Sequence, residues 1–491
     1  AWSRGAMSTA LSILEDAGAH DSLYARRLRS EAQLLEPDFR LPVPKGYESA
    51  DMSTRVDDEP LRVLHLLTNS LPHTQSGYTL RSHRILTALS DQGIESVALT
   101  RTGYPVMIGK PGAAEEDVVD GIRYVRTLPI RLPGTQQLRL EAEVTRALEL
   151  VKEFRPHVIH ATTNYLNALV AQAVSDATGL PWVLEVRGLM EKTWIASHRS
   201  EESRAIARDS EKHDLIAAKE GEFASVASAV VTLSKTMASE LVLRGADHEA
   251  ITIVPNGVDD KLFDNHVSTD RAREIVGLDE KMDSGVDPVM VGAVSALVDY
   301  EGFDVLLRAA ALLLEDDRAP TELRDRLRIV IAGEGVSRPG LLALARELGI
   351  QQRVHLPGRV ARCEARLWVE ALDLVVLPRK DMEVTRAVTP QKPIEAMALA
   401  RPLILSDLPA VREVISTPEG LPVAVCVPPG DAEALADAIL RWWHGANAAH
   451  YGSVEARAVA SSRSWSVQVR RYRNLYERVT HRTGGGADNG Q

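Results

Sequence analysis

Short apolar runs alternate with longer helical stretches along most of the chain, and this alternation constrains the fold more than any other feature. The runs "LRVLHLL" (61–67) and "WVLEV" (182–186) are typical of strands that are buried on both faces. Each run precedes a longer stretch of helical periodicity, which predicts parallel strands joined by helical crossovers in a doubly wound α/β sheet. The pattern restarts at residue 289. The other strand-like runs are residues 157–161, 229–233, 251–254, 289–294, 327–333, 353–358, 372–378, 401–407 and 422–427.

The chain has 491 residues, which is too long for one hydrophobic core and predicts two Rossmann-like domains, residues 61–255 and 256–445. Residues 1–60 are interpreted as an N-terminal extension and linker with one amphipathic helix, "LYARRLRSEAQLLEP" (23–37). Residues 446–491 are expected to form a last helix that packs back across the first domain, followed by a flexible tail. Two sheets that face each other place a ligand at the carboxyl ends of their strands, in the cleft between the domains.

Composition excludes several classes of protein. A net charge of −11 disfavours a general nucleic-acid binder, because that function needs basic surface against phosphates. The two cysteines, Cys363 and Cys426, lie in no CxxC or Cys/His cluster, so neither structural zinc nor a disulfide framework is expected. No Asp-x-Asp run indicates a catalytic metal. We therefore expect a cytoplasmic protein without a metal or a cofactor.

Four residues in the first half are candidates for ligand binding. Ser76 and Gly77 follow the first strand, where a helix N-terminus suits an anion; the alternative is a plain turn with glycine at positive φ. His160 ends a strand and is expected to bind a sugar hydroxyl, with a satisfied interface histidine as an equal alternative. Arg187 ends the next strand and is costly to bury, which favours a role with phosphate or carboxylate.

The second half has a cluster of cations around one loop. Arg379 and Lys380 end a strand, and Lys392 precedes the helix that begins near Ile394. Three cations beside a helix N-terminus are suited to holding a diphosphate. Glu395, in the first turn, is interpreted as a ligand for two ribose hydroxyls; as an alternative, it only stabilises the helix dipole.

From Leu61 to Val479 the sequence resembles the family 4 glycosyltransferases. The resemblance rests most on "VPNGVD" (254–259) and "KPIEAMALARPLILSD" (392–407), and also on "SGYTLRSHRIL" (76–86). It implies the GT-B architecture of two Rossmann-like domains facing across a cleft, with a C-terminal crossover helix. It also implies retaining, metal-independent transfer from a nucleotide-diphosphate sugar. The donor nucleotide is then expected in the second domain and the acceptor mostly in the first.

The resemblance also assigns roles to individual residues. The family's ribose-binding carboxylate corresponds to Glu395, and its diphosphate-binding amides correspond to the loop Thr389–Lys392. The expected catalytic residues are His160, Arg379, Lys380 and Lys392; the donor-binding residues are Thr389, Gln391, Glu395, Gly335, Arg359 and Val360; and the acceptor or phosphate loop is Ser76, Gly77 and Arg187.

Two departures from the family pattern bear on the site. Many members clamp the diphosphate with an Arg and a Lys, which we match to Ala293 and Glu301, and place a further Glu where this chain has Ala387. The "YEG" and "TPxKPxEAM" patterns resemble a branch associated with exopolysaccharide and cell-envelope assembly. In that branch Arg379 and Lys392 are the expected substitutes for the clamp.

These observations predict a glycosyltransferase that acts on a glycan, a lipid-linked or a small-molecule acceptor. A catalytically degenerate protein that binds nucleotide or glycan is the alternative, and a hydrolysing sugar-nucleotide epimerase ranks last because "VTPQKP" (388–393) offers no acidic group. Arg26, Arg27 and Arg29 suggest contact with the inner face of an anionic membrane, or only a solvated helix face. The sugar, the base, the acceptor and the oligomeric state stay open.

Overall fold

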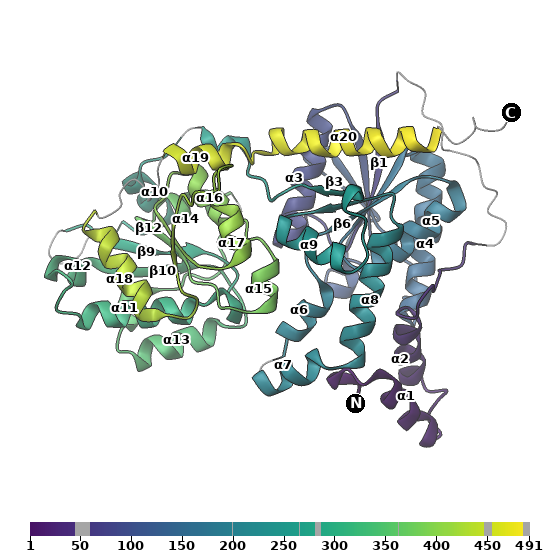
Figure 1. Ribbon diagram of the computed structural model, residues 1–491, viewed down its shortest axis with the longest axis horizontal. Coiled ribbons are helices and arrows are strands. Elements are labelled where there is room, and N and C mark those ends of the chain that lie inside the picture. The colour runs from purple at the N-terminus through teal and green to yellow at the C-terminus, as the bar shows by residue number, and fades with distance from the viewer. Residues whose placement is uncertain are drawn as a thin grey trace. The chain divides into compact units, whose positions relative to one another are not determined.

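The computed structural model describes residues 1–44, 59–198, 200–264, 266–279, 286–361, 363–445 and 454–484. It contains two compact units, Ala1–Pro255 with Ser466–Gln491, and Asn256–Trp465 (Figure 1). Each unit is built on one sheet of mostly parallel strands with helices on both faces. The predicted fold class, two doubly wound α/β domains, is therefore confirmed.

The sheet of the first unit has eight strands in the order β3-β4-β2-β1-β5-β6-β7-β8, and only the β3–β4 pair is antiparallel. The chain builds outward from β1 on one side and then continues with β5 on the other side. The strand order therefore reverses between β1 and β5, where the carboxyl ends of the strands leave room for a ligand. The strands are β1 (Arg62–Leu67), β2 (Glu95–Thr100), β3 (Glu116–Val119), β4 (Ile122–Val125), β5 (Val158–Thr162), β6 (Trp182–Val186), β7 (Ala229–Thr232) and β8 (Ile251–Ile253).

Side-chain caps fix where the main helices of this unit begin. Ser76 Oγ accepts a hydrogen bond from the backbone N–H of Thr79, and Asn164 Oδ1 accepts one from Leu166, which satisfies free N–H groups at the two helix starts. The caps also place polar residues at the carboxyl edge of the sheet. The helices after β1 are α3 (Gly77–Asp91), α4 (Gln136–Phe154), α5 (Tyr165–Thr178), α6 (Met190–Ala196), α7 (Glu201–Arg208), α8 (Glu211–Val226) and α9 (Lys235–Leu243).

The N-terminal residues form two helices on the first unit, α1 (Met7–Asp16) and α2 (Leu23–Gln33) (Figure 1). The helix expected in residues 23–37 corresponds to α2, whereas α1 was not anticipated. Leu34 and Leu35, which follow α2, are buried, so this segment packs on the unit. Part of the predicted linker, residues 45–58, lies outside the described residues.

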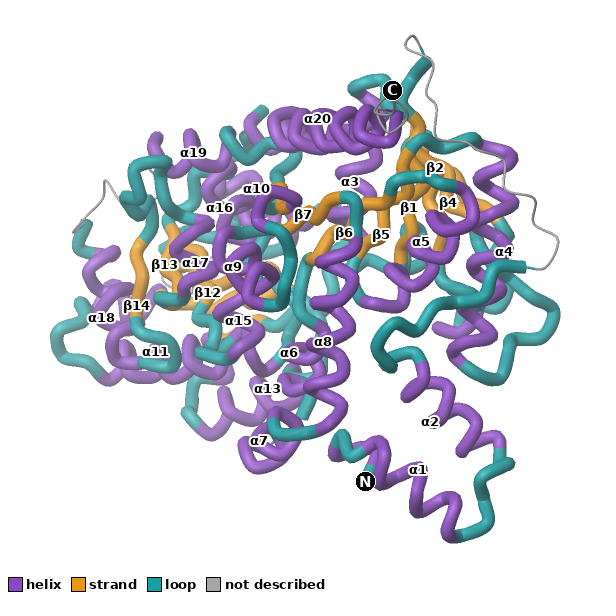
Figure 2. The backbone as a smooth tube through the Cα atoms, turned by 45° about the vertical axis from the view of Figure 1, so that its right-hand side comes forward, coloured by secondary structure: helices purple, strands orange, loops and turns teal. Residues whose placement is uncertain are grey.

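The sheet of the second unit has six parallel strands in the order β11-β10-β9-β12-β13-β14. Figure 2 labels its last three strands, β12, β13 and β14. Its apolar core is formed by both faces of β9, β10, β12 and β13 and by the helices that cover them. The strands are β9 (Val289–Val294), β10 (Leu327–Ala332), β11 (Val354–His355), β12 (Leu374–Leu377), β13 (Leu403–Ser406) and β14 (Val425–Val427). The helices include α11 (Phe303–Glu315), α13 (Arg338–Glu347), α15 (Glu383–Ala387), α16 (Lys392–Ala398) and α18 (Ala432–Trp443).

The last helix, α20 (Trp465–Gly484), follows the second unit in sequence, yet from Ser466 onward it belongs to the first unit. Tyr472 and Tyr476, one turn apart, are fully buried there. The Tyr476 hydroxyl lies 2.7 Å from Nδ1 of His160 on β5. The closing helix thus contributes buried polar groups beneath the carboxyl edge of the first sheet.

Candidate functional site

A polar cavity of about 200 Å³ lies at the carboxyl ends of β1, β5 and β6 in the first unit. Ser76, at the start of α3, and Arg187, which directly follows β6, both line it. Gly77 is the first residue of α3 and does not have positive φ, so the alternative of a glycine-dependent turn is wrong at this position. The remaining lining residues are Leu67, Thr68, Asn69, Tyr78, Thr79, Ser82, Thr162, Thr163 and Asn164.

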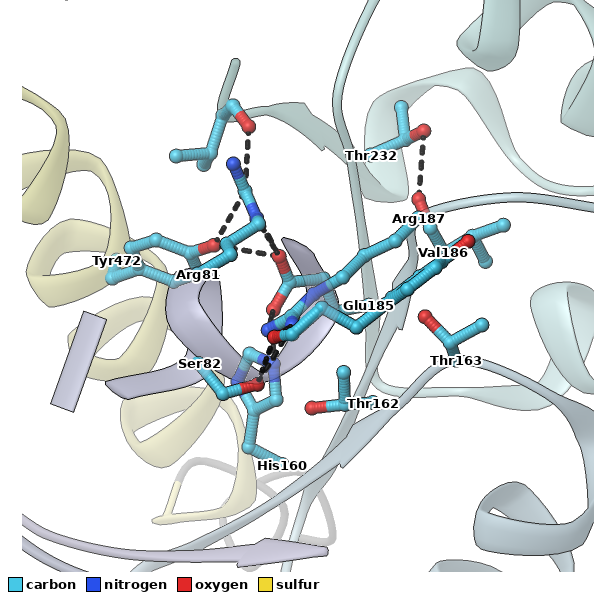
Figure 3. Close-up of polar contacts among 12 residues, drawn as sticks. Arg81, Ser82, His160, Thr162, Thr163, Glu185, Val186, Arg187, Thr232 and Tyr472 are labelled. Atoms are coloured by element: carbon cyan, nitrogen blue, oxygen red, sulfur yellow. Dashed lines mark hydrogen bonds and ion pairs between the residues drawn. The ribbon is translucent and has the colours of Figure 1, made fainter. Parts of the chain in front are cut away.

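Beneath this cavity Glu185 of β6 is completely buried and holds a network of charged groups (Figure 3). Its Oε1 accepts hydrogen bonds from Arg81 Nε at 3.1 Å and from the Tyr472 hydroxyl at 2.9 Å. Its Oε2 lies 2.9 Å from Arg187 Nη2 and 3.0 Å from His160 Nε2. A carboxylate with this many donors is satisfied even without water.

The charges of this network leave the floor of the cavity positive. Burial by itself would raise the pKa of Glu185, but Arg187 and Arg81, with the His160 hydrogen bond, hold it well below its ordinary value. Two guanidinium groups therefore face one carboxylate. Burial, followed by the neighbouring His160, lowers the pKa of His65, whose ring stacks on His160 at 4.9 Å. A ligand that carries negative charge is favoured above this floor.

His160 is placed differently from the sequence expectation. Its side chain is completely buried, and both ring nitrogens are engaged, with Tyr476 and Glu185. It does not line the cavity, so its position matches the alternative of a satisfied internal histidine and gives no support to a direct contact with a sugar hydroxyl. The position of His160 near the end of a strand correctly placed it close to the carboxyl edge of the sheet. The tyrosines of α20 that cover its side chain were not predicted.

Arg187 does line the cavity, as its place at the end of β6 predicted. Its Nη1 donates to Ser82 Oγ at 2.7 Å and to the Tyr78 carbonyl at 3.0 Å, whereas its Nε has no hydrogen-bond partner among the described residues. The hydroxyl groups of Thr162 and Thr163, which also line the cavity, likewise have no hydrogen-bond partner among the described residues. Buried polar groups without partners are costly, so these atoms mark where ligand oxygens would be stabilised.

In the second unit the loops after β9, β10 and β12 lie against one another at the carboxyl edge of the sheet. A Cβ at Gly302 would lie 1.9 Å from the Pro378 carbonyl oxygen, and one at Gly335 would lie 2.2 Å from that of Leu297. Only glycine permits these approaches, and Gly302 also has φ of 75°. Gly335 is thus required by backbone packing, and its predicted contact with the donor stays a prediction.

Two of the three predicted cations surround one buried carboxylate, Glu301. Lys392 Nζ lies 3.2 Å from Glu301 Oε2 and also contacts Ser295 Oγ. Arg379 Nε lies 3.9 Å from Glu301 Oε1, too far for a hydrogen bond, and its Nη1 donates to the Val388 carbonyl at 3.0 Å. Arg379 is only 5% exposed, and its Nε lacks a hydrogen-bond partner in the described part of the chain.

Lys380 points to a different set of groups from the other two cations. Its Nζ lies 2.8 Å from Asp299 Oδ1 and 3.1 Å from Asp304 Oδ2. Desolvation acts to lower the pKa of Lys380, but these two carboxylates raise it above its ordinary value. Two anions already neutralise Lys380, so its surroundings differ from those of Arg379 and Lys392, and its role toward a diphosphate stays a prediction.

The other donor-binding candidates lie on the same edge of the second unit. The Thr389 carbonyl accepts a hydrogen bond from Asn256 Nδ2 at 2.9 Å, and its buried hydroxyl has no hydrogen-bond partner within the described ranges. Gln391 Nε2 donates to Glu395 Oε1 at 3.0 Å across the first turn of α16. Arg359 is exposed, and Val360 packs partly against the apolar core. Their roles toward a donor stay predictions.

One correspondence drawn from the sequence needs correction. Ala293 lies inside β9, opposite Ile331 of β10, and its side chain is buried. A clamp residue at that position would point into the core, whereas Ser295, just beyond the end of β9, contacts Lys392. Ala387, the position of the missing Glu, ends α15 and is 5% exposed.

In the part of the chain that the structure describes, no helix is long and apolar enough to cross a membrane. Within the same ranges, His, Cys, Asp and Glu side chains form no group of three or more that could hold a metal ion. Arg26, Arg27 and Arg29 of α2 are exposed, and Arg27 Nε donates to the Gly134 carbonyl at 3.0 Å.

Comparison with known proteins agrees with this geometry. A family model described as "Glycosyl transferase 4-like domain" matches residues 76–257, and one described as "Glycosyl transferases group 1" matches residues 288–444. The chain is 24% identical to an uncharacterised glycosyltransferase of Methanocaldococcus jannaschii over 65% of this chain and 75% of that protein. It is 29% identical to the D-inositol 3-phosphate glycosyltransferase of Thermobispora bispora over 59% of this chain and 65% of that protein.

Solved structures share the fold at low sequence identity. Sucrose-phosphate synthase from Thermosynechococcus elongatus matches with a TM-score of 0.67 and 18% identity, over 86% of this chain and all of that chain. Anabaena HepE in complex with UDP matches with a TM-score of 0.61 and 16% identity, over 85% of this chain and all of that one. The chain has the GT-B fold of these structures, and two glycosyltransferase domain models match its two halves. It is an enzyme that transfers a sugar from a nucleotide-sugar donor.

Proposed function

We propose that this glycosyltransferase transfers a sugar from a nucleotide-diphosphate sugar to a glycan, lipid-linked or small-molecule acceptor, with retention at the anomeric carbon and without a metal ion. The expected setting is surface polysaccharide or glycoconjugate biosynthesis, including peripheral contact with a membrane. The observation that carries the proposal is the cluster at Arg379, Thr389 and Lys392 beside the N-terminus of α16. Arg379 Nε and the Thr389 hydroxyl are buried there without hydrogen-bond partners among the described residues.

The chemistry of a departing diphosphate explains why such a cluster is useful. When the bond between the anomeric carbon and the phosphate oxygen breaks, negative charge develops on that oxygen. Arg379 Nε and the Thr389 hydroxyl are N–H and O–H groups that already lie in place and have no competing acceptor among the described residues. Preorganised donors of this kind stabilise the developing charge without reorganisation.

Lys392 and Glu301 form the second element of the mechanism. Their ion pair holds the Lys392 ammonium group beside Ser295, at the end of β9. A diphosphate that approaches this ammonium group competes with Glu301 for it, while Arg379 remains near the same carboxylate. The acceptor hydroxyl then attacks from the face that the leaving group vacates, and its proton passes to the departing phosphate oxygen. This transfer therefore needs no nucleophilic side chain from the protein.

The first unit supplies the proposed acceptor site. Ser76, Arg187 and the threonines of the cavity at β1, β5 and β6 present hydroxyl and guanidinium groups to an acceptor. His160 acts there as a positioning residue, because it contacts Glu185, which in turn holds Arg187. The loss of the family's basic clamp, which suggested a degenerate protein, is compensated by the cations around Glu301.

A panel of nucleotide sugars tests the proposal directly. Thermal unfolding identifies the donor, because a ligand that binds only the folded state raises Tm. Product formation with chelator present, followed by NMR of the anomeric configuration, then tests metal independence and retention. Loss of turnover on chelation, or an inverted product, would refute these two parts separately. Nucleotide binding without any transfer to any acceptor would refute the proposed reaction.

A further inference from the structure

A second cavity, of about 90 Å³, lies in the first unit at the carboxyl ends of β1 and β2. Arg101, which follows β2, and Arg139 and Glu143 of α4 line it. Thr68 and Asn164 line both this cavity and the larger one described above, so the two are neighbours. The volume suits one small chemical group and not a complete sugar ring.

Two residues that line this cavity each have a buried polar atom without a hydrogen-bond partner in the described ranges. Glu143 is 1% exposed; its Oε2 accepts a hydrogen bond from Thr102 N–H at 3.2 Å, but its Oε1 has no hydrogen-bond partner among the described residues. Arg101 Nε lacks one as well. An unpaired buried donor and an unpaired buried carboxyl oxygen in one cavity are together costly, and a ligand that bonds to both removes the cost.

The charges decide which kind of ligand fits. Burial raises the pKa of Glu143 to about 7, against the Thr102 hydrogen bond and the charge of Arg101, so a large share of this side chain carries a proton at neutral pH. A protonated carboxyl group donates a hydrogen bond through its O–H. Burial lowers the pKa of Arg101, and burial together with the charge of Arg27 lowers the pKa of Arg139. Neighbouring acids therefore do not fully compensate the positive charge of either arginine. A cationic amine would face two arginines, whereas an anion would be stabilised by both.

We infer that this cavity binds the phosphate or carboxylate group of the acceptor. The inference rests on the proposed function, since it treats the neighbouring cavity as the acceptor site. An acceptor whose hydroxyl lies near Thr162 and Arg187 reaches the second cavity past Thr68 and Asn164, which line both. The acceptor class is therefore a sugar or glycan that bears an acidic group close to the attacking hydroxyl.

The rim of the cavity indicates two sources for the acidic group. Met107, which lines the cavity, belongs to the short helix η2 (Val106–Ile108), whose three apolar residues are each about 42% exposed. Leu132, near Gly103, and the fully exposed Ile130 lie on the neighbouring loop. A lipid phosphate would place its chain against this apolar rim, whereas a soluble sugar phosphate or uronic acid would need only the arginines.

Sulfate is a suitable probe, because its charge is constant from about pH 6 to about pH 8, the range in which Glu143 titrates. The rise of Tm with sulfate is measured for the wild-type protein and for Arg101→Gln, Glu143→Gln and Arg328→Gln. Arg328 of β10 is the control, since burial also lowers its pKa but it lies in the second unit. Arg379→Gln reports any sulfate that binds at the donor site.

We expect Arg101→Gln to weaken the sulfate response about tenfold in concentration, while Arg328→Gln leaves it unchanged. In the wild-type protein the response weakens as pH rises through about 7, because Glu143 loses the proton that it donates. Glu143→Gln keeps a neutral donor, so its response becomes independent of pH. Equal sulfate responses in the wild-type protein and Arg101→Gln, or an unchanged pH dependence in Glu143→Gln, would overturn the inference. The sulfate response and its pH dependence are both measured without turnover. A failure of the proposed reaction can therefore be distinguished from a failure of this inference.

Vesicle sedimentation distinguishes the two sources. If the acidic group is carried by a lipid, the protein sediments with phosphatidylcholine vesicles that contain phosphatidylglycerol, and Val106→Ser/Ile108→Ser abolishes this. Leu243→Ser, at an 85% exposed position of α9, is the matched control and keeps sedimentation. If the source is soluble, the protein does not sediment, and glucose 1-phosphate displaces sulfate at the wild-type cavity but not in Arg101→Gln.

Discussion

Lys392 Nζ lies 3.2 Å from Oε2 of Glu301, a carboxylate that is only 8% exposed. Glu301 directly precedes Gly302, the N-cap residue of α11, whereas Lys392 begins α16. Burial by itself would raise the pKa of Glu301, but Lys392 and then Arg379 hold it below its ordinary value. The basic pair expected from the family resemblance is therefore replaced by an ion pair whose cation is located on α16.

Removing Lys392 should destabilise the second unit, because Glu301 would remain buried with Arg379, 3.9 Å away, as its one remaining cation among the described residues. We expect Lys392→Ala to lower the free energy of unfolding by about 1 to 3 kcal/mol, less than for a fully buried pair because the lysine side chain is partly exposed. The double variant Glu301→Gln/Lys392→Met should recover most of this stability without recovering transfer activity. Urea unfolding and product formation measure the two effects.

The control for this pair is Arg271→Ala, which breaks a surface ion pair with Glu274 where both side chains are more than half exposed. It should change stability by no more than about 0.5 kcal/mol. If Lys392→Ala is as stable as the wild-type protein, the ion pair with Glu301 is not a structural element.

Arg379 and Lys380 are adjacent in sequence but should differ in their effect on turnover. Arg379 has an unpaired Nε at the proposed diphosphate site, so Arg379→Gln should lower kcat by roughly 10². Lys380 is neutralised by Asp299 and Asp304, so Lys380→Gln should lower kcat by less than about tenfold. Steady-state kinetics with saturating donor compares the two, and circular dichroism checks that both variants fold. Equal losses would show that Lys380 contributes as much to turnover as Arg379, despite its two acidic partners.

Much of the fold was predictable because parallel strands that are buried on both faces leave continuous apolar runs. The runs at 182–186 and 289–294 coincide with β6 and β9. Strands β2 to β4 were missed. "ESVALT" opens with an exposed Glu95 and a half-buried Ser96, which leaves only a short apolar run, and "IRYV" contains Arg123, which pairs with two exposed acids. The Asp120–Gly121 turn between β3 and β4 was a usable hairpin signal.

The site was predictable in position but not in pairing. Residues at strand ends, such as Arg187 and Arg379, could be placed at the carboxyl edge because all parallel strands end there. The partners could not be inferred, because Glu185 meets Tyr472 from a helix 287 residues later in the chain. A glutamate inside the apolar run "WVLEV" was nevertheless a signal, since a buried carboxylate requires cationic partners.

Glu185 should make the first unit sensitive to acid. Its pKa in the folded protein is well below that of the unfolded chain, so its stabilising effect is complete above about pH 4 and is lost as pH falls through the folded value. Glu185→Gln leaves Arg81 and Arg187 without a counter-charge, and should cost about 3 kcal/mol or more at pH 7. In the variant, the free energy of unfolding should also no longer show the decrease at acid pH that protonation of Glu185 causes. Urea unfolding from about pH 3 to about pH 7 measures both.

Glu202→Gln, at an exposed position in the first turn of α7, is the matched control and should leave the pH profile unchanged. A Glu185→Gln variant with the stability and acid dependence of the wild-type protein would contradict the role given to this network.

Tyr472 should tie α20 to the first unit. Its hydroxyl donates to Glu185 Oε1 at 2.9 Å and accepts from Arg81 Nη2 at 3.1 Å. Tyr472→Phe removes hydrogen bonds to two charged groups and should cost about 1.5 to 3 kcal/mol. Amide hydrogen exchange should rise along α20 before it rises in β5 or β6. Tyr24→Phe, at a 58% exposed position of α2, should change neither quantity. Uniform exchange along all of these elements would show that the helix has no separate attachment.

Glu220 of α8 should respond to pH in the opposite direction to Glu185. Burial, and then the neighbouring Glu191, raise the pKa of Glu220 to about 8, while the N–H of Met190 donates to its Oε2 at 3.2 Å. The folded protein therefore keeps a proton that the unfolded chain releases near pH 4, and stability falls as pH rises from about 4 to about 8.

Glu220→Gln keeps the Met190 hydrogen bond without the titration. We expect it to raise the free energy of unfolding by about 2 kcal/mol at pH 7 and by less at pH 5, in urea titrations beside the Glu202→Gln control. A stabilisation that does not depend on pH would contradict the assignment of this proton to Glu220.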